Sequence, residues 1–472
     1  MNSGRTERVS TTQNVAKRNL SESKRRQSFA NERRRVVLGA LALLGTVASS
    51  LGISGVRTRT RQAIGNESTQ LEKMQEVAGV DAPVDWFRED WTFDADSFSL
   101  PTAAREAIDE SLKRLAERLN NDGSLGSASE LFGRDPGVAG LCGLAFLAAG
   151  SVPGRGRFGG ELEKIVSYIL SQSFDLQKTA NGAQNSNVRN YSQENELSVR
   201  EVDGLIANFR EKGRKPMYGH GFATLFLAAI LGMTERSEVR ERTRAAVDLI
   251  ARAQNAEGGW RYEPKPVPVA DLSVTVCQLS ALRAARDAGI LVPNATIEKA
   301  VAYVERCQNA DGGFRYMTLD GPSGVARTAA AILALQTGGA DDSAAVEAAF
   351  RYLEKAAPLA SSGGVKRLTS IGSEEEKSLL LVADDEIPRL PTTRIEYYFY
   401  GEFYAAAAYW RAARDAASKE RWARWARRAY PNLLSRRGDD GLWRSNVSTD
   451  AETAFVLCAL LTPFERAPFF LR

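Results

Sequence analysis

Histidine is almost absent from this chain of 472 residues, and cysteine is sparse. His220 is the single histidine, and the four cysteines lie far apart without any Cys-x-x-Cys spacing: Cys142, Cys277, Cys307 and Cys458. Structural zinc sites take closely spaced Cys and His ligands, so the sequence predicts no metal and no other cofactor. The disulfide state of the cysteines stays open, because a sequence does not reveal connectivity.

Excess positive charge is missing from most of the chain. Residues 1–35 carry ten Lys or Arg and three Glu, a net charge of +7, whereas the whole chain has a formal net charge of +4. The remaining residues therefore sum to −3, which is +4 minus +7. Proteins that bind nucleic acid carry a basic surface on the folded body, so we expect no nucleic-acid partner.

A long uncharged run follows the basic tail. It extends from Val36 to Val56, 21 residues rich in Val, Leu, Ala and Gly, between Arg35 and Arg57. A helix of this length just spans a bilayer, and the positive residues before it would stay on the cytoplasmic side. We therefore predict a single-pass membrane protein with a cytoplasmic N-terminus and an extracytoplasmic main domain.

A cleaved export signal is the alternative interpretation of the same run. Arg34-Arg35-Val36-Val37-Leu38 resembles a degraded twin-arginine pattern, and Ala48-Ser49-Ser50 offers small residues for cleavage. A buried core helix is the third interpretation, which the three arginines at 33–35 disfavour. The first two interpretations both place the main domain outside the cytoplasm.

Two kinds of helical pattern alternate from Pro101 to the C-terminus. Six segments are charged on one side and apolar on the other: 103–119, 162–173, 240–253, 297–306, 343–355 and 419–433. Six others are apolar on all sides and rich in small residues: 138–149, 222–233, 274–285, 326–335, 397–413 and 453–461. One-sided helices lie at a surface and wholly apolar helices are buried, so the pattern predicts an all-α fold in which outer and inner helices alternate.

These segments divide the chain into four parts. We expect a basic cytoplasmic tail at 1–35, an anchor or signal at 36–56, a stalk at 57–100 and the helical body at 101–472. Five aromatic residues should dock the stalk onto the body: Trp86, Phe87, Trp91, Phe93 and Phe98. Two polar stretches, 176–216 and 358–393, are predicted to be long excursions between helices, the first with a short helix near 199–209.

Outer and inner helices in alternation close naturally into a double ring, the (α/α)6 toroid. Because successive helices are antiparallel, every inner helix would begin at the same end of the ring. The free N–H groups at these helix starts would then surround a central mouth.

One nine-residue segment occurs twice, 54 residues apart. The copies are Gln254-Asn255-Ala256-Glu257-Gly258-Gly259-Trp260-Arg261-Tyr262 and Gln308-Asn309-Ala310-Asp311-Gly312-Gly313-Phe314-Arg315-Tyr316. The paired glycines permit a sharp reversal after an outer helix, and the aromatic residue that follows can fill the junction between hairpins. The leading glutamine can bond to the next repeat, so this motif is predicted to be structural. Weaker copies lie at 121–123 and 437–443.

The motif Gln-x-x-x-Gly-x-Trp, with Leu249 or Tyr303 five residues before the glutamine, resembles the repeat of the squalene cyclase and protein prenyltransferase β-subunit superfamily. The resemblance spans residues from about 101 to 472 and implies the double ring of helices. A repeat of this kind declares an architecture and does not by itself identify a reaction.

The catalytic residues that the resemblance implies are largely missing. Cyclases carry Asp-x-Asp-Asp-Thr-Ala, whose central Asp protonates the polyprene; the best local match is Asp450-Ala451-Glu452-Thr453-Ala454, with Ala451 at that position. Prenyltransferases bind zinc through Asp, Cys and His, but no Asp-x-Cys occurs on a predicted inner helix. The Cys-Gly-Glu-Gln of complement-type thioester domains is absent as well.

Candidate functional residues gather near the predicted starts of inner helices. The weak catalytic candidates are Asp450, Glu452 and His220, and the candidate ligand-binding residues are Arg327, Tyr398, Glu402 and Asp271. Helix caps, core packing or a bond to a loop would explain most of them structurally. Arg327 is the exception, because a cation at a helix start is disfavoured and requires an acidic partner or a bound anion.

We therefore predict a membrane-anchored, exported repeat protein that acts as a non-catalytic binding or scaffold module, with a peptide, lipid or anionic ligand at the mouth. The alternative is a divergent squalene-type cyclase or a transferase on the same fold. A lyase acting on polysaccharide is a third hypothesis, which needs Tyr, His and Arg in an open cleft. Three carboxyl groups that meet in an aromatic cavity would favour the cyclase, whereas a shallow groove would favour binding.

Overall fold

A computed structural model of the protein describes residues 84, 86, 89–126, 132–176, 186–209, 216–356, 395–444 and 448–467. The chain forms two compact units, Met1–Val84 and Asp85–Arg472, and every described helix belongs to the second. The predicted anchor from Val36 to Val56 lies outside the described residues. None of the described helices combines the length and the apolar character that a membrane span requires.

Twelve described helices build the body, and each corresponds to one predicted segment. The outer helices are α3 (Thr102–Glu117), α5 (Gly159–Ser171), α9 (Ser237–Ala253), α11 (Asn294–Arg306), α13 (Ala344–Ala356) and α16 (Ala416–Leu434). The inner helices are α4 (Pro136–Ala148), α8 (Met217–Ala229), α10 (Leu272–Asp287), α12 (Val325–Thr337), α15 (Ile395–Ala412) and α17 (Thr449–Leu461). A 3₁₀ turn, η2 (Thr462–Phe464), follows α17.

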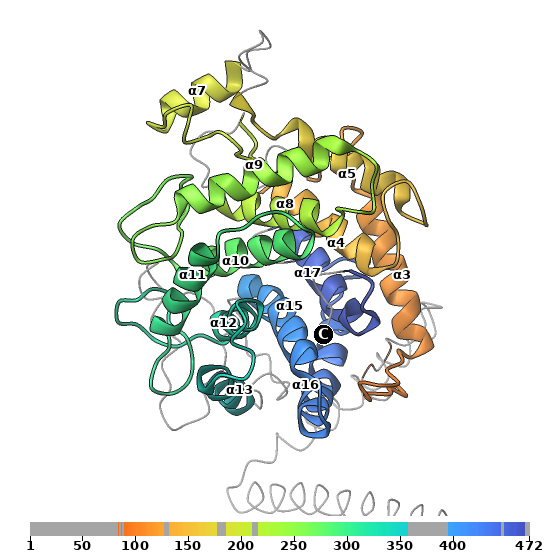
Figure 1. The fold of residues 1–472 in the computed structure, drawn as a ribbon. Helices are drawn as coiled ribbons and strands as arrows, with labels where there is room; N and C mark the ends of the chain where they lie inside the picture. The colour runs from red at the N-terminus through yellow and green to blue at the C-terminus, as the bar shows by residue number, and fades with distance from the viewer. Residues whose placement is uncertain are drawn as a thin grey trace, which may run out of the picture. The chain divides into compact units, whose positions relative to one another are not determined.

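The inner helices form a closed ring. Each packs against the next in the order α4, α8, α10, α12, α15 and α17, and α17 packs against α4 (Figure 1). The outer helices pack on this ring from outside, and α3 contacts both α4 and α17, where the ends of the ring meet. The prediction of an all-α toroid with two layers is thus confirmed for the described part of the chain.

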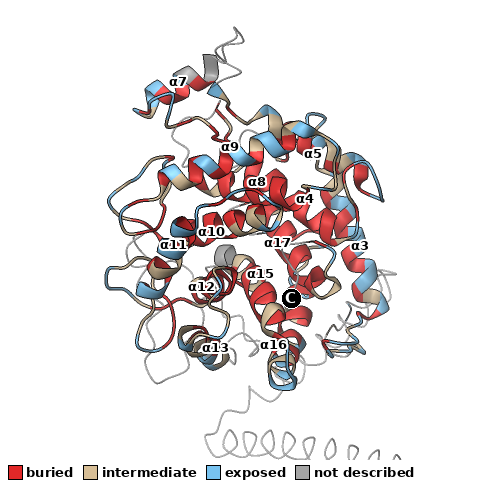
Figure 2. Ribbon diagram, viewed as in Figure 1, coloured by how far each residue is buried: buried red, intermediate tan, exposed pale blue. Residues whose placement is uncertain are grey.

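Burial follows the predicted alternation of helix types. All thirteen residues of α4 are buried, because helices surround it on every side. In α9, buried residues recur every three or four positions, from Val239 through Thr243 and Ala246 to Ala253, while the charged residues face outward. Figure 2 shows the same contrast between the inner and outer layers.

Glycines let α4 and α8 approach closely at their starts. A Cβ atom added to Gly137 would lie 2.4 Å from the Cα of Gly219, and one added to Gly219 would lie 2.5 Å from Oδ1 of Asp135. The sequence pattern placed the start of α8 at residue 222, five residues late, because Tyr218-Gly219-His220-Gly221 looks like a turn. Close packing, and not flexibility, explains these glycines.

A shared turn connects outer to inner helices. In the turn of Gly258, φ is 93°, and a Cβ added there would lie 2.3 Å from the carbonyl oxygen of Lys299 on the next outer helix. The same contact with the next outer helix occurs at Gly123, Gly204 and Gly312. These four turns therefore rest directly on the backbone of the next outer helix, whereas a Cβ on Gly441 in the final copy would meet the side chains of Arg437 and Arg114.

The aromatic residue of the turn is tied to the inner helix that follows. The backbone N–H of Trp260 donates to Oγ1 of Thr275 at 3.1 Å, and that of Phe314 donates to Oγ1 of Thr328 at 2.9 Å. The weak final copy does the same, since the N–H of Trp443 donates to Oγ1 of Thr453 at 3.1 Å. All three aromatic side chains are buried.

Glutamine ties each strong copy of the motif to the next repeat. Nε2 of Gln254 donates to the carbonyl of Gly258 and to that of Thr296 in α11, both at 2.8 Å. Nε2 of Gln308 donates likewise to Gly312 at 3.0 Å and to Ala345 in α13 at 2.8 Å. Gly259 and Gly313 are buried between these bonds.

The first polar excursion, at 176–216, is inserted within one of these turns. Phe174 and Gly204 pair through their backbones as the residues of an uninterrupted turn do, and the residues between them are inserted there. The described part of the insertion contains α7 (Ser186–Glu194), whereas 199–209 forms turns. The prediction of a helix near 199–209 is therefore wrong: Gly204 takes a positive φ of 85° within a turn. The stretch 358–393 lies outside the described residues.

Aromatic residues dock the segment before α3 onto the body, as predicted. Trp91 and Phe93 each contact the ring of Tyr430, with centroids 6.1 Å apart in both pairs. Phe98 packs edge-to-face on Trp422 at 5.6 Å. Trp86 packs more loosely against the same core, and Phe87 lies outside the described residues.

The turn glycines offer a matched pair of substitutions. Gly258→Ala should lower the free energy of unfolding by about 1–2 kcal/mol for the left-handed backbone, and by about 1–3 kcal/mol more for the clash with Lys299. Gly339→Ala is the control, since its φ of 94° is equivalent and no atom lies within 4 Å of its added Cβ. Urea unfolding measures both; equal losses would contradict the role assigned to the close contact.

Candidate functional site

Polar side chains gather where the inner helices begin. We call this group the rim cluster and define it by six residues from α8, α10, α12, α15 and the turns between them: Tyr218, Tyr262, Asp271, Tyr316, Arg327 and Tyr400. Asp271 is fully buried, whereas the other five are partly exposed. The cluster includes two of the four candidate ligand-binding residues.

Asp271 caps the start of α10. Its Oδ1 accepts hydrogen bonds from the N–H of Val274 and the hydroxyl of Ser273, both at 2.8 Å. Its Oδ2 is buried and accepts no hydrogen bond of standard geometry within the described residues. Burial raises the pKa of this carboxyl, and its bond to Val274 opposes the rise. The hydroxyl of Tyr316 also bonds to this carboxyl and lowers its pKa, so Asp271 is a buried acid whose Oδ2 lacks only a donor of standard geometry within the described residues.

Four tyrosines surround this carboxyl. The hydroxyls of Tyr262 and Tyr316, which occupy the same position in the two strong repeats, bond to each other. Tyr316 lies close enough to Asp271 to lower the pKa of the carboxyl, and the ring of Tyr218 lies 6.3 Å from that of Tyr262. Burial raises the pKa of both Tyr218 and Tyr316, so these hydroxyls stay protonated.

Arg327 joins the cluster from the first turn of α12, the neighbour of α10 in the ring. Its guanidinium donates to the carbonyl of Pro322 at 3.0 Å and fills the space beside Gly324. Tyr400 lies near Asp271 and Arg327, because the charges of both residues affect its pKa, which burial raises. The carbonyl of Pro322 thus provides one partner for the cation that the sequence placed at a helix start.

Aromatic rings cross the axis of the ring next to this cluster. Phe222 of α8 contacts Phe455 of α17, with centroids 5.9 Å apart, and Phe455 contacts Tyr400 and Phe403 of α15 at 5.8 and 5.1 Å. Helices α8 and α15 stand three places apart in the ring in either direction. The line of rings therefore joins opposite walls, and Phe403 and Phe455 are buried within it.

His220 is a structural residue of the core. Its Nδ1 accepts the N–H of Ile206 at 3.2 Å, and Nε2 lies 3.3 Å from the carbonyl of Ala246, to which it donates as the neutral tautomer. Burial lowers the pKa of His220 to about 4. Ile206 follows Gly204 as Trp260 follows Gly258, so His220 replaces the threonine that receives the N–H in other repeats. Both ring nitrogens are thus engaged in holding a turn.

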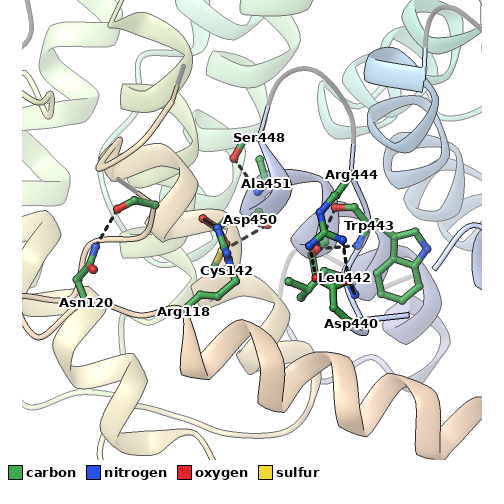
Figure 3. A network of polar contacts seen from close by, with 12 residues as sticks. Arg118, Asn120, Cys142, Asp440, Leu442, Trp443, Arg444, Ser448, Asp450 and Ala451 are labelled. Carbon is green, nitrogen blue, oxygen red and sulfur yellow. Dashed lines mark hydrogen bonds and ion pairs between the residues drawn. The ribbon is translucent and has the colours of Figure 1, made fainter. Parts of the chain in front are cut away.

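Asp450 forms an ion pair and not an acid cluster. Arg118, at the end of α3, donates to both carboxyl oxygens of Asp450, with NH2 at 3.2 Å from Oδ2, while the backbone carbonyl of Asp450 lies 3.7 Å from Sγ of Cys142 (Figure 3). Arg444 forms a separate pair with Asp440 beside it. Glu452 is buried in the same turn of α17. The described contacts of Asp450 are thus with a guanidinium and a thiol, and not with a second carboxyl group.

Tyr398 and Glu402 lie away from the rim cluster. The indole of Trp425 in α16 donates to Glu402 at 3.1 Å, and the guanidinium of Arg436, two residues after the end of α16, lies 4.6 Å from the ring of Tyr398. Burial raises the pKa of Glu402. The four candidate ligand-binding residues therefore belong to two separate places, because α15 presents Tyr398 and Tyr400 to different neighbours.

The described residues contain no group of three metal-binding side chains. All four cysteines are buried free thiols, which settles the disulfide state that the sequence left open. Burial raises the pKa of Cys277 and Cys458, so both remain protonated near neutral pH.

The structure identifies a second match to the cyclase motif, which sequence reasoning missed. Thr275 and Thr453 are equivalent, because each receives the N–H of a turn aromatic. In Asp-x-Asp-Asp-Thr the first Asp precedes Thr by four residues and the proton-donating Asp precedes it by two. Asp271 therefore stands at the first position, and Ser273 stands at the proton donor's position.

Comparison with known proteins supports the resemblance in the repeats. Residues 216–371 match the family described as squalene-hopene cyclase C-terminal domain. No curated protein matches. Similar solved structures include a type II terpene cyclase from Scytonema with geranylgeranyl dihydroxybenzoate, at 14% identity over 77% of this chain and 97% of that chain, with a TM-score of 0.43. An α-1,6-mannanase of Salegentibacter sp. is 8% identical over 76% of this chain and 99% of that chain, with a TM-score of 0.45. A D-mannose isomerase is 12% identical over 77% of this chain and 99% of that chain, with a TM-score of 0.49.

The pKa of His220 predicts a pH dependence of stability. The folded pKa of about 4 lies below the ordinary 6.5, so the unfolded chain binds the proton first as pH falls. Stability linked to this group is complete above pH 6.5 and is lost toward pH 4, by about 3 kcal/mol. His220→Gln keeps a donor and an acceptor but does not titrate. The difference in unfolding free energy between the two proteins should shrink from pH 7 to pH 4.5; a constant difference would contradict the assignment.

Proposed function

We propose, from the match of residues 216–371 to the squalene-hopene cyclase C-terminal domain and from the repeats, that the chain is an exported, membrane-anchored ring protein that binds a ligand at the rim cluster without cyclising it. The proposal combines a family architecture with a site whose chemistry differs from that of the family's enzymes. The fold by itself does not indicate the activity, because one fold serves several functions.

The crossing of the axis by aromatic rings is the observation that carries this proposal. A cyclase has to fold a long polyprene within the ring before it protonates the chain. Here Phe455 contacts Phe222 on one wall and Tyr400 on the opposite wall, so these rings take up part of the interior in which such a substrate would have to fold. We therefore expect a ligand to bind at the partly exposed tyrosines of the rim cluster.

The proton donor is also replaced. Ser273 stands where the family motif has its central Asp, and a serine hydroxyl cannot protonate an alkene. In the second match that position is Ala451, and the neighbouring Asp450 is neutralised by Arg118. Strong acids in enzymes depend on coupled carboxyl groups, and neither match supplies them.

One observation favours the alternative of a divergent cyclase or transferase. Asp271 is buried, and burial raises its pKa although the bonds from Val274, Ser273 and Tyr316 oppose the rise. A buried carboxyl can act as a general acid when it carries a proton. Of the carboxyl groups in the rim cluster, Asp271 is the residue through which any such chemistry would pass.

Membrane anchoring rests on the sequence from Val36 to Val56. A basic tail before an uncharged run of this length favours insertion with the tail inside. An anchor of this type would hold the ring at the outer face of the membrane, where a ligand of the cell envelope can reach the rim.

An assay for cyclisation tests the proposed function. The full chain in detergent should return squalene and geranylgeraniol unchanged after prolonged incubation, as judged by gas chromatography with mass spectrometry, while a squalene cyclase run in parallel shows turnover. A cyclised product from this chain that disappears in Asp271→Asn would establish the alternative, with Asp271 as the acid.

Cell fractionation tests the anchor. The full-length protein should remain in membranes after carbonate extraction, and protease added to cells with a permeabilised envelope should digest the ring and spare the tail. Replacing Leu41 and Leu43 by Arg should release the protein from the membrane, because each charge disfavours insertion by about 2.5–3.5 kcal/mol. A shortened, freely soluble wild-type protein would support the cleaved signal instead.

A further inference from the structure

We infer that the ligand of the rim cluster is a neutral saccharide, held by Asp271 and the surrounding tyrosines. This inference rests on the proposed binding function and specifies its ligand class. It depends on the polar groups that the cluster leaves available, on the rings that flank them and on the charges nearby.

The buried oxygen of Asp271 defines the first requirement. Oδ2 is desolvated and accepts no hydrogen bond of standard geometry within the described residues, while Oδ1 is fully used by Ser273 and Val274. The hydroxyl of Tyr316 bonds to the same carboxyl, but Oδ2 has no donor of standard geometry within the described residues, so a ligand O–H or N–H directed at Oδ2 would add a favourable bond. A ligand that brings a donor to Asp271 is therefore favoured.

The tyrosine pair defines the second requirement. The hydroxyls of Tyr262 and Tyr316 bond to each other, and each hydroxyl can both donate and accept. These groups lie beside Asp271, so a ligand that reaches all of them needs donors and acceptors on neighbouring atoms. Adjacent hydroxyl groups on a sugar ring meet this requirement, whereas the single hydroxyl of a polyprenyl alcohol does not.

The tyrosine rings provide an apolar surface for the same ligand. Tyr218, Tyr262, Tyr316 and Tyr400 are partly exposed, and the rings of Tyr218 and Tyr262 are inclined by 34° to each other. The hydroxyl of Tyr400 is buried, so the polar tips come from the other three tyrosines, and rings with such tips suit a ligand with one C–H face and a hydroxylated edge. A sugar ring has this combination of surfaces.

Local charge disfavours ligands with a net charge. Arg327 and Arg261 lie close enough to affect Tyr400 and Asp271, and the starts of the inner helices add partial positive charge, so an ammonium group would be repelled. An anion would have to approach the desolvated carboxyl of Asp271. A neutral ligand avoids both costs.

Calorimetric titration of the full chain in detergent with maltotriose, cellotriose and α-1,6-mannotriose tests the inference. At least one trisaccharide should bind. Tyr262→Phe removes a hydroxyl but keeps the ring and should weaken that binding about fivefold, and Asp271→Asn should weaken it more. Tyr398→Phe is the matched control on α15, remote from the cluster, and should bind as the wild type does. Unfolding midpoints of all variants establish that they are folded.

The outcomes separate this inference from the proposed function. Absence of binding by all three sugars, together with geranylgeraniol binding that Tyr262→Phe weakens, would overturn the saccharide and retain a binding site at the rim. Sugar binding that Tyr262→Phe and Asp271→Asn leave unchanged would also overturn it. Turnover of a polyprene would overturn the proposed function itself.

Discussion

The contact between a turn glycine and the backbone of the next outer helix, made by Gly123, Gly204, Gly258 and Gly312, is the constraint on which the structure depends. At Gly258 a side chain would occupy the position of the carbonyl oxygen of Lys299, so the two repeats meet backbone to backbone. The same turn then gives the N–H of Trp260 to Thr275, which fixes the next inner helix. One turn thus sets the position of an outer helix and an inner helix together, and its repetition curves the helices into a ring.

The closed ring has a direct consequence for the site. It brings residues from α8, α10, α12 and α15, which are distant in sequence, to one end of the inner layer. Asp271 caps its helix and still keeps a buried oxygen toward the tyrosines, because the cap uses only Oδ1. Aromatic rings that join opposite walls lie next to this rim, and Tyr400 belongs to both groups. The fold therefore supplies a polar, partly exposed site beside an interior that contains aromatic side chains.

Much of the fold could be predicted from the sequence, because both signals behind it are local. Wholly apolar and one-sided segments give the two layers, and the Gly-Gly-aromatic copies give the turns. The copy at Gly204 escaped notice because an insertion separates it from Phe174, its partner in the turn. The site was harder: Asp271 was identified as a cap, but its relation to the cyclase motif needed the equivalence of Thr275 and Thr453. Tyr398 was grouped with Asp271 because sequence does not reveal which side of α15 faces the axis.

Closure of the ring is the central claim, and the pair Arg118–Asp450 tests it most directly, since 332 residues separate the two partners. The measurement is a double-mutant cycle on the free energy of unfolding, with Arg118→Met, Asp450→Asn and the double variant. A closed ring predicts a coupling of about 2–3 kcal/mol, with Arg118→Met the more costly single change because it leaves a buried carboxylate unpaired. Additive effects of the two substitutions would show that the first and last helices do not meet, and would contradict the account.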